Sequence, residues 1–359
     1  MSKQLMRGNH VVAEAAIRAG CRCYFGYPIT PQNELGEYMS ENLPKVKGGV
    51  YIQAESELAA INMTLGAAAT GARVMTSSSS PGVSLKQEGI SFLAGQELPA
   101  VIVNMTRGGP GLGNIAPSQA DYFQATRGGG HGDYRTMVVA PSSLQELANL
   151  TRLAFELADK YRNPVVILGD GLLGQMMEPV EFPEPIKYWK LPKKEYALTG
   201  RGDNPSRFIR SLLLDTTVEE EHNWKLHRKY QQIQKNEVLY ESINTDDAEL
   251  VIVAYGVAAR IAKGAMKRAR REGIPIGIIR PITLYPFPSE IIKNAAKHVK
   301  NFLVYEMNTG QMIDDVKLAL EGDATVHFYG RPGGTVSTPI ELERVIERVY
   351  QSIRKESQQ

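Results

Sequence analysis

Short, almost wholly apolar runs alternate with helix-forming segments along most of this chain. Ala100–Met105 (Ala-Val-Ile-Val-Asn-Met) is the clearest run, and Pro164–Leu168 and Leu250–Tyr255 have the same character. A strand that is apolar on both faces belongs to a parallel sheet covered by helices on both sides. The sequence therefore predicts an α/β protein.

The alternation continues through the first half of the chain. Its predicted strands are Cys23–Tyr27, Val50–Gln53, Arg73–Thr76, Ala100–Met105, Met137–Ala140 and Pro164–Leu168. Its predicted helices are Gly8–Arg18, Pro31–Met39, Ser56–Thr70, Leu85–Ala94 and Leu144–Lys160. Residues 1–173 are therefore expected to form one doubly wound domain.

The character of the chain changes after Gly174. Met176–Pro192 contains four prolines and is expected to be a connector, and Val218–Ser242 has the pattern of a polar amphipathic helix. Residues 174–247 are thus predicted to be a linker with a helical segment. A second doubly wound domain is expected over 248–359. Its predicted strands are Leu250–Tyr255, Ile274–Ile279, Asn301–Glu306 and Thr325–Tyr329.

Composition excludes several classes of protein. The chain has 359 residues, 22% charged residues and a net charge of +2 with both signs interspersed, so no nucleic-acid footprint is expected. No run approaches the ~20 uncharged apolar residues that cross a bilayer. The N-terminus has no apolar segment of a secretory signal, and a cytoplasmic protein is expected.

The two cysteines, Cys21 and Cys23, constrain any redox role. An iron–sulfur cluster takes four thiolate ligands, so this chain is expected to carry no cluster of its own. Cys23 lies in a predicted buried strand, where a free thiol behaves as a small apolar side chain. If the protein transfers electrons, the redox centres are expected on partner subunits.

Two neighbouring segments indicate a ligand site. Gly26–Pro31 (Gly-Tyr-Pro-Ile-Thr-Pro) breaks a predicted strand and presents Thr30 at its carboxyl end, where open α/β sheets bind ligands. About a helix's length later, Glu55 and Glu57 precede the apolar, small-residue segment Leu58–Ala69. A carboxylate buried at the start of such a helix needs a partner.

Together these segments carry a family resemblance. Gly26–Pro31 followed by Gln53–Ala60 (Gln-Ala-Glu-Ser-Glu-Leu-Ala-Ala) resembles the pyrimidine-binding domain of thiamine-diphosphate-dependent 2-oxoacid:ferredoxin oxidoreductases. Thr76–Gly82, Arg107–Gly111 and Gly130–Asp133 follow in the order that this family shows. The resemblance extends from about Leu5 to Arg348.

The last third resembles the C-terminal domain of transketolase-like enzymes, through Arg280–Pro288 and Val304–Gln311. In such enzymes this domain is mainly architectural. Glu306, Asn308 and Gln311 are therefore expected at a domain interface more than in catalysis.

The resemblance implies a cofactor site. Glu57 would be the catalytic carboxyl that hydrogen bonds to N1′ of the aminopyrimidine, a role that needs a carboxyl shielded from water. Glu55 is the less favoured alternative, because its place suits an interaction with the helix N-terminus. Tyr27, Pro28 and Ile29 would also contact the cofactor.

The resemblance also places Thr30 and Arg107 at the substrate, where an arginine can bind a carboxylate through two hydrogen bonds. The alternative for Arg107 is a surface residue of a glycine loop. His131 is a further candidate substrate contact. Other cations near the predicted site loops, which the sequence does not place in a pocket, are Lys86, Arg127 and Arg135.

A metal site is not expected in this chain. Gly169-Asp170-Gly171, with Asn204 downstream, is similar to the start of the diphosphate and Mg²⁺ motif of thiamine enzymes, but the residues between are proline-rich and lack the needed helix and strand. The glycine loops at 108–113 and 128–132 lack the patterns of phosphate-binding loops. The Mg²⁺ and diphosphate half of the cofactor site is therefore expected on a partner.

The resemblance implies an α-type subunit of an enzyme that converts a 2-oxoacid, CoA and oxidised ferredoxin into acyl-CoA, CO₂ and reduced ferredoxin. It implies a β-type partner with the diphosphate site and iron–sulfur clusters, a γ-type subunit and a small ferredoxin-like subunit. A branched-chain substrate, 2-oxoisovalerate (3-methyl-2-oxobutanoate), is favoured over 2-oxoglutarate. A non-oxidative thiamine enzyme and a non-catalytic scaffolding subunit stay open as alternatives.

Overall fold

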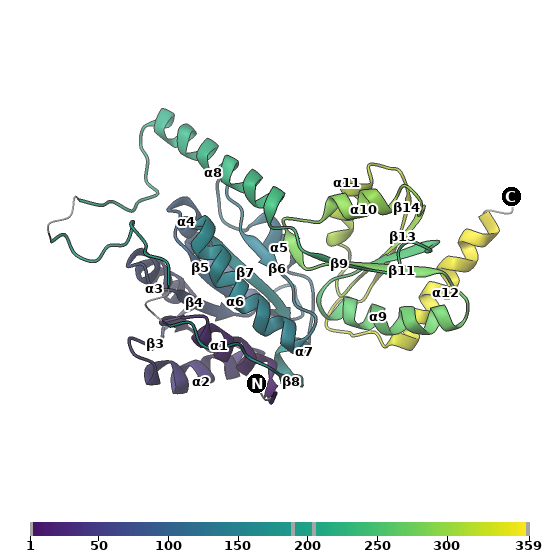
Figure 1. Ribbon diagram of the computed structural model, residues 1–359, viewed down its shortest axis with the longest axis horizontal. Coiled ribbons are helices and arrows are strands. Elements are labelled where there is room, and N and C mark those ends of the chain that lie inside the picture. The colour runs from purple at the N-terminus through teal and green to yellow at the C-terminus, as the bar shows by residue number, and fades with distance from the viewer. Residues whose placement is uncertain (1–2, 188–190, 203–205, 357–359) are drawn as a thin grey trace.

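The computed structural model describes residues 3–187, 191–202 and 206–356. Figure 1 shows two lobes, each built around a sheet, with the N-terminal half of the chain in one and the C-terminal part in the other. Helix α8 (Thr216–Asn236) lies along the first lobe.

The first lobe contains a seven-stranded sheet in the order β12-β6-β7-β5-β4-β2-β3. Its strands pair in parallel except β12, which pairs antiparallel with β6. In sheet order the strands are β12 (Thr283–Tyr285), β6 (Met137–Val139), β7 (Pro164–Asp170), β5 (Ala100–Thr106), β4 (Val74–Ser78), β2 (Cys23–Gly26) and β3 (Val50–Gln53).

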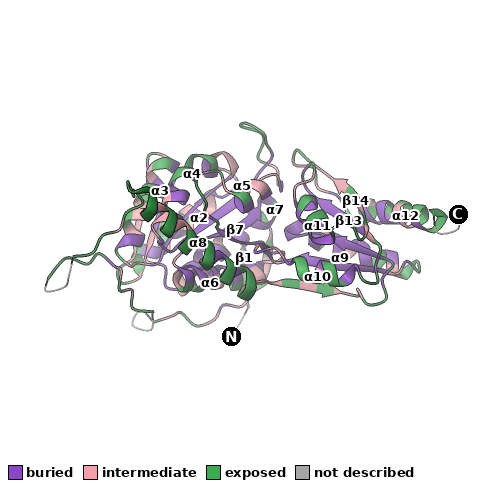
Figure 2. Cartoon of the chain, turned by 90° about the horizontal axis from the view of Figure 1, so that it is seen from above, coloured by how far each residue is buried: buried purple, intermediate pink, exposed green. Residues whose placement is uncertain are grey.

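Helices cover both faces of this sheet, as the apolar strands predict. On β5, Val101 and Val103 join a core cluster with α1 (Gly8–Arg18), α2 (Asn33–Asn42) and α6 (Leu144–Tyr161). Ala100 and Ile102, on the other face of the pleat, join a cluster with α3 (Glu57–Ala69) and α4 (Ser80–Gly95). Figure 2 shows this buried interior between the helices. The predicted α/β class is confirmed.

The second lobe has a five-stranded sheet in the order β14-β13-β10-β11-β9, parallel except for the antiparallel edge strand β9. Its strands are β14 (Thr325–Gly330), β13 (Asn301–Glu306), β10 (Leu250–Val253), β11 (Ile276–Pro281) and β9 (Tyr240–Ile243). Its helices are α9 (Gly256–Arg271), α10 (Ser289–Ala295), α11 (Met312–Leu320) and α12 (Pro339–Glu356).

The remaining elements are short. They are β1 (Gln4–Arg7), which pairs with β8 (Met177–Val180), the 3-10 turn η1 (Leu43–Lys45), α5 (Tyr122–Arg127) and α7 (Gly171–Gln175). No helix in the described ranges combines the length and apolar character needed to span a membrane.

Three local features were not predicted. The helix predicted over Val218–Ser242 ends at Asn236, and β9 follows it. The connector Met176–Pro192 contains β8, because a proline in an edge strand need not donate a ladder hydrogen bond. Residues of the second lobe form β12 on the first sheet, so the two predicted domains share an edge strand. The limits 1–173, 174–247 and 248–359 stay a prediction.

Candidate active site

A series of hydrogen bonds fixes the loop that follows β2, residues 27–32. The Tyr24 hydroxyl lies 2.6 Å from Ser77 Oγ, which in turn donates to Gln32 Oε1 at 2.6 Å. Gln32 Nε2 then donates to the Tyr27 carbonyl at 3.4 Å. Gly26 is required at the turn, because a Cβ there would lie 2.5 Å from the Tyr24 hydroxyl. The loop is therefore fixed at the carboxyl edge of the sheet.

The predicted cofactor residues lie on the open side of this loop. Tyr27 and Pro28 are exposed, and Ile29 and Thr30 are half-buried. They reach the surface where the carboxyl ends of β2 and β4 meet, which is the edge predicted for ligand binding.

Glu57 is the first residue of α3. Ser56 caps the helix by accepting a hydrogen bond from the backbone N–H of Ala59 at 3.2 Å. This cap turns Glu57 inward, where it is 5% exposed, and leaves Glu55 exposed to solvent. Only Glu57 of the two is shielded from water as the proposed chemistry requires.

The Glu57 carboxylate approaches the first turn of α4. A Cβ added to Gly82 would lie 2.4 Å from Glu57 Oε1 and 2.1 Å from Ser78 Oγ. The Ser78 and Ser79 hydroxyls are buried and have no hydrogen-bond partner within the described chain. The sequence indicated Thr76–Gly82 only as a family motif and missed that its glycine makes room for the carboxylate.

Lys86 lies one turn further along α4 and is fully buried. Its Nζ donates to Thr76 Oγ1 at 2.5 Å and to the Ser77 carbonyl at 3.1 Å. Burial lowers the pKa of Lys86 to about 7, and the negative charge of Glu57 opposes that shift. The sequence had left this lysine unplaced, since a polar contact between a helix and a distant strand has no local pattern.

Arg107 follows β5 and joins the two loops of the site. Its Nη1 donates to the Thr30 carbonyl at 2.9 Å and its Nη2 to the Leu112 carbonyl at 3.1 Å. It is 8% exposed, so the alternative of a surface residue was wrong. Its Nε is buried with no partner in the described ranges, which leaves one edge of the guanidinium for a ligand.

His131 lies apart from this cluster. It is exposed, and its ring meets that of Phe92 edge-on at 6.4 Å between centroids. Phe92 is ten residues beyond Gly82 on α4, a separation of about 15 Å at 1.5 Å per residue. The structure does not bring His131 to Thr30, Arg107 and Glu57, and its role as a substrate contact stays a prediction.

Asp170 caps a short helix. It ends β7 and caps α7, where its Oδ1 accepts hydrogen bonds from the backbone N–H groups of Leu172 and Leu173 at 2.9 and 3.0 Å. Burial raises the pKa of Asp170 to about 6. Asn204 lies outside the described residues. Among the described residues, no three His, Cys, Asp or Glu side chains are grouped as metal ligands.

The residues predicted for the domain interface are there. Glu306 accepts hydrogen bonds from backbone N–H groups at the start of α11. Asn308 Nδ2 donates to the Gln119 carbonyl at 2.9 Å, and Gln311 Nε2 donates to the Ala120 carbonyl at 2.7 Å, both across the interface. The interface prediction is confirmed for Asn308 and Gln311, whereas Glu306 reaches the interface only through its hydrogen bond from Asn308 Nδ2.

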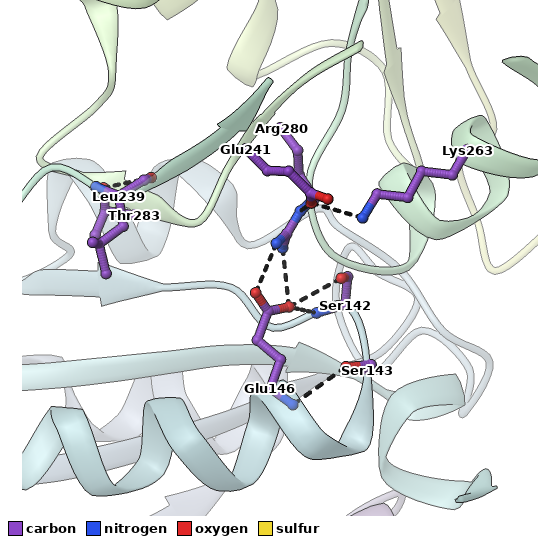
Figure 3. A network of polar contacts seen from close by, with 8 residues as sticks. All are labelled: Ser142, Ser143, Glu146, Leu239, Glu241, Lys263, Arg280 and Thr283. Carbon is purple, nitrogen blue, oxygen red and sulfur yellow. Dashed lines mark hydrogen bonds and ion pairs between the residues drawn. The ribbon is translucent and has the colours of Figure 1, made fainter. Parts of the chain in front are cut away.

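A second interface contact was missed by sequence reasoning. Figure 3 shows the Arg280 guanidinium between two carboxylates. It donates to both Glu146 oxygens, at 3.0 and 2.7 Å, and to Glu241 at 2.8 Å, and Lys263 also reaches Glu241 at 2.7 Å. The bidentate pair joins β11 of the second lobe to α6 of the first.

The atoms around Glu57 fit the edge of an aminopyrimidine ring. The carboxyl is buried without a hydrogen-bond partner among the described residues. Gly82 leaves space at that carboxyl, and the partnerless polar atoms of Ser78, Ser79 and Arg107 lie at or just after the ends of β4 and β5. Buried polar groups are rarely left unpaired unless a ligand or water completes them.

The chain matches two family models. Residues 14–244 match the one described as "Pyruvate flavodoxin/ferredoxin oxidoreductase, thiamine diP-bdg". Residues 248–342 match "Pyruvate:ferredoxin oxidoreductase core domain II".

Among curated proteins, ketoisovalerate oxidoreductase subunit VorB of Methanothermobacter thermautotrophicus is 53% identical over 97% of both chains. The 2-oxoglutarate synthase subunit KorA of Methanocaldococcus jannaschii is 37% identical over 96% of this chain and 100% of that protein.

Among solved structures, the 2-oxoglutarate:ferredoxin oxidoreductase of Magnetococcus marinus, with 2-oxoglutarate, coenzyme A and succinyl-CoA bound, has a TM-score of 0.86 at 25% identity. The match covers 97% of this chain and 65% of that one. An inactive β4 tetramer of a split-gene transketolase matches with a TM-score of 0.59 at 12% identity, over 96% of this chain and 97% of that one, which is a likeness of fold.

Proposed function

Since the chain belongs to the pyruvate flavodoxin/ferredoxin oxidoreductase family, we propose that it is the 2-oxoacid:ferredoxin oxidoreductase subunit that holds the aminopyrimidine of thiamine diphosphate and the 2-oxoacid. The observation that carries the proposal is the buried, partnerless Glu57 carboxyl facing the space beside Gly82. When bound, thiamine diphosphate supplies the carbon nucleophile for the ketone of a 2-oxoacid.

Glu57 holds a proton at its carboxyl for N1′ of the pyrimidine, in a site from which α3 and α4 exclude water. Tyr27, Pro28 and Ile29 form the open wall against the ring, on a loop that Gln32 keeps rigid. A rigid loop keeps the pyrimidine ring at a fixed position relative to the proton-bearing oxygen of Glu57. Such preorganisation raises the rate of reaction.

Arg107 and Thr30 bind the 2-oxoacid. The Nε–H of Arg107 and the second N–H of Nη2 lie on the same edge of the guanidinium and suit a carboxylate. Thr30 is fixed beside it, because its carbonyl accepts from Nη1 and its Oγ1 accepts from Asn33 Nδ2 at 3.5 Å.

A branched-chain 2-oxoacid suits the charges of the site better than 2-oxoglutarate, whose second carboxylate needs a second cation. Lys86 is enclosed, and Arg127 pairs with Asp315 at 2.8 Å. Arg135 is exposed, with Nη1 donating to the Tyr134 carbonyl. The 53% identity to a ketoisovalerate oxidoreductase subunit, against 37% to a 2-oxoglutarate synthase subunit, supports the same choice.

A partner chain completes the cofactor site. Helix α3 is apolar on nearly all sides, which is typical of a helix buried on all faces. Leu58 on α3, Leu85 on α4 and Val50 and Ile52 on the edge strand β3 are nevertheless exposed. Exposed apolar side chains on these elements, which carry or adjoin Glu57 and Gly82, support a docked partner.

In this proposal the partner on that patch is a β-type subunit that supplies the Mg²⁺ and diphosphate site and the iron–sulfur clusters. A γ-type subunit and a small ferredoxin-like subunit complete the complex, which uses CoA and ferredoxin. The names of the relatives as enzyme subunits support a multi-subunit assembly.

Two measurements test the proposal. The complex reconstituted with its partners should oxidise 2-oxoisovalerate with a higher kcat/KM than 2-oxoglutarate or pyruvate, and a preference for 2-oxoglutarate would overturn the substrate assignment. Calorimetry on the isolated chain should give weak or no heat with thiamine diphosphate and Mg²⁺. Tight Mg²⁺-dependent binding to this chain alone would contradict the shared site.

A further inference from the structure

A cavity of about 1360 Å³ lies at the amino-terminal edge of the first sheet. Its wall includes Arg22 and Arg73, which directly precede the parallel strands β2 and β4. Thr30 follows the other end of β2, and the strands between are four and five residues long, at about 3.3 Å per residue. The cavity is therefore separate from the candidate active site.

The described wall of the cavity is strongly basic. Seven of its residues are lysine or arginine, against one acid, Glu195. Three of the cations lie just before strands of the sheet: Arg22, Lys47 and Arg73. Four belong to the segment that follows β8: Lys187, Lys193, Lys194 and Arg207. Since the whole chain has a net charge of only +2, this concentration of positive charge is a local feature.

Helix ends do not account for this charge. Helices α1 and α3 both end at this edge, and the C-terminus of a helix carries about half a negative charge. The carbonyl of Ala69, the last residue of α3, already accepts a hydrogen bond from the Leu198 N–H at 2.9 Å. Together with Asp159 and Glu195, the two helix ends offset about three of the seven positive charges. A clear excess of positive charge is left.

Two of these cations are buried and share one carboxylate. The side chains of Arg73 and Lys194 are 4% and 9% exposed, and they lie 2.8 and 2.5 Å from the two oxygens of Asp159. Arg73 also donates to the Ala19 carbonyl after α1. Burial lowers the pKa of Lys194, and the Arg73 charge adds to this shift while Asp159 opposes it. Burying two cations against a single carboxylate is costly, and a bound anion would offset that cost.

We propose that this cavity binds a small anion with two or more phosphate groups. A phosphate group carries about 1.5–2 negative charges and several strong acceptor oxygens, so few groups are needed to balance the excess. On Arg207, Nη1 donates to the Ala197 carbonyl at 2.8 Å, and the edge formed by Nε and Nη2 suits phosphate oxygens. The bound anion joins the segment that follows β8 to the edge of the sheet.

Calorimetry on the full chain with inorganic triphosphate, at low ionic strength and without Mg²⁺, tests the site. Wild type should bind one triphosphate per chain. In Lys47→Gln/Lys193→Gln the Kd should rise about 3–10-fold, because two exposed cations that face the anion are lost. Lys267→Gln/Lys297→Gln removes two exposed lysines of the second lobe and should keep the wild-type Kd at the same net charge. No heat in wild type, or an equal loss in both variants, overturns the proposal.

Lys194→Met tests the buried part of the site. The Kd for triphosphate should rise, while the urea midpoint without the anion should stay near the wild-type value, because Asp159 keeps Arg73 as its partner. A lysine that serves only the fold would give the reverse, a lower midpoint with an unchanged Kd, and that result contradicts the proposal. If this variant fails to fold, the pair of exposed lysine variants still decides it.

Further titrations identify the source of the phosphate groups. Equal Kd values for ATP and triphosphate would mean that the site recognises the phosphate chain alone, and tighter binding of ATP would mean that it also contacts the nucleoside. Mg²⁺ should weaken either interaction, because it neutralises phosphate charge, which distinguishes this site from Mg²⁺-dependent binding of thiamine diphosphate. A polyglutamate peptide that binds more tightly than both would overturn the proposal in favour of an acidic protein segment.

Discussion

Two buried glutamates, one in each lobe, lie near the carboxyl edge of a parallel sheet and have opposite surroundings. Glu57 is the first residue of α3, and Glu306 is the last residue of β13. Glu306 accepts hydrogen bonds from the backbone N–H groups of Gln311, Met312 and Ile313 and from Asn308 Nδ2, at 2.8 to 3.1 Å. Glu57 is nearly as buried and has no hydrogen-bond partner among the described residues.

Under the proposed function, this difference separates a structural carboxylate from one that binds a ligand. Four donors make the Glu306 site complete, so it fixes α11 and the interface beside Gln119. Around Glu57, the described chain gives no hydrogen-bond partner to the carboxyl or to the Ser78 and Ser79 hydroxyls, and the missing side chain of Gly82 leaves space beside them. Burial alone identifies neither role. The number of hydrogen bonds that each carboxylate accepts distinguishes them.

The sharpest way to break this comparison is Glu57→Gln. Turnover of the reconstituted complex should fall by about 10²–10⁴-fold, because a proton-handling carboxyl is lost. The denaturation midpoint should stay near the wild-type value, since no hydrogen bond of the chain is removed. Glu55→Gln, at the exposed neighbour, is the control and should keep wild-type turnover. Loss of activity in the control alone would reverse the assignment.

Gly82→Ala tests the space beside the carboxyl. The new methyl group would overlap Glu57 Oε1 and Ser78 Oγ and displace the carboxylate, and a misplacement of about 1 Å can cost about 10²-fold in rate. Gly66→Ala, on α3 where a Cβ meets nothing within 4 Å, is the matched control for stability. Steady-state rates and circular dichroism distinguish the outcomes, and an unchanged rate in Gly82→Ala would show that the space serves no ligand.

Glu306→Gln should give the converse result. The amide keeps one acceptor oxygen but turns an NH₂ group toward backbone donors, which costs about 1–3 kcal/mol of stability. Urea denaturation of the full chain measures this loss. Turnover per folded complex should stay unchanged, because Glu306 serves the interface. A large fall in turnover with stability intact would make Glu306 a functional residue and remove the contrast with Glu57.

Much of the fold follows from local pattern. The apolar run Ala100–Met105 became β5, and helix predictions such as Gly8–Arg18 were confirmed to the residue. The errors lie at β8, β9 and β12, which are three or four residues long. Such strands exist because a distant strand pairs with them, and the local sequence does not reveal that partner.

The motifs predicted individual side chains of the site. Thr30, Arg107 and Glu57 all lie at the carboxyl edge of the first sheet, and their roles there stay predictions. The space at Gly82 and the burial of Lys86 were missed, because they depend on how α4 packs against α3 and β4. The Ser-Ser-Ser-Pro-Gly sequence that opens α4 was the available signal, since a proline and a glycine in the first turn suggest a close approach there.

The smallest expected effect concerns Asp170, at the carboxyl end of β7, and tests whether its buried carboxyl is protonated in the fold. Its pKa is about 6 in the fold, against an ordinary 3.8, so the folded state binds a proton there more readily than the unfolded state does. This contribution to stability is fully present below pH 3.8 and is lost as the pH rises through 6. Relative to Asp170→Asn, which keeps a capping side chain, wild type should gain about 1.4 kcal/mol between pH 7 and pH 5. Urea denaturation of both chains at the two pH values measures the difference. The difference in unfolding free energy between wild type and Asp170→Asn could instead stay constant, or wild type could lose stability toward pH 5. Either result would mean that Asp170 is ionised in the fold and stabilised by its hydrogen bonds, as Glu306 is.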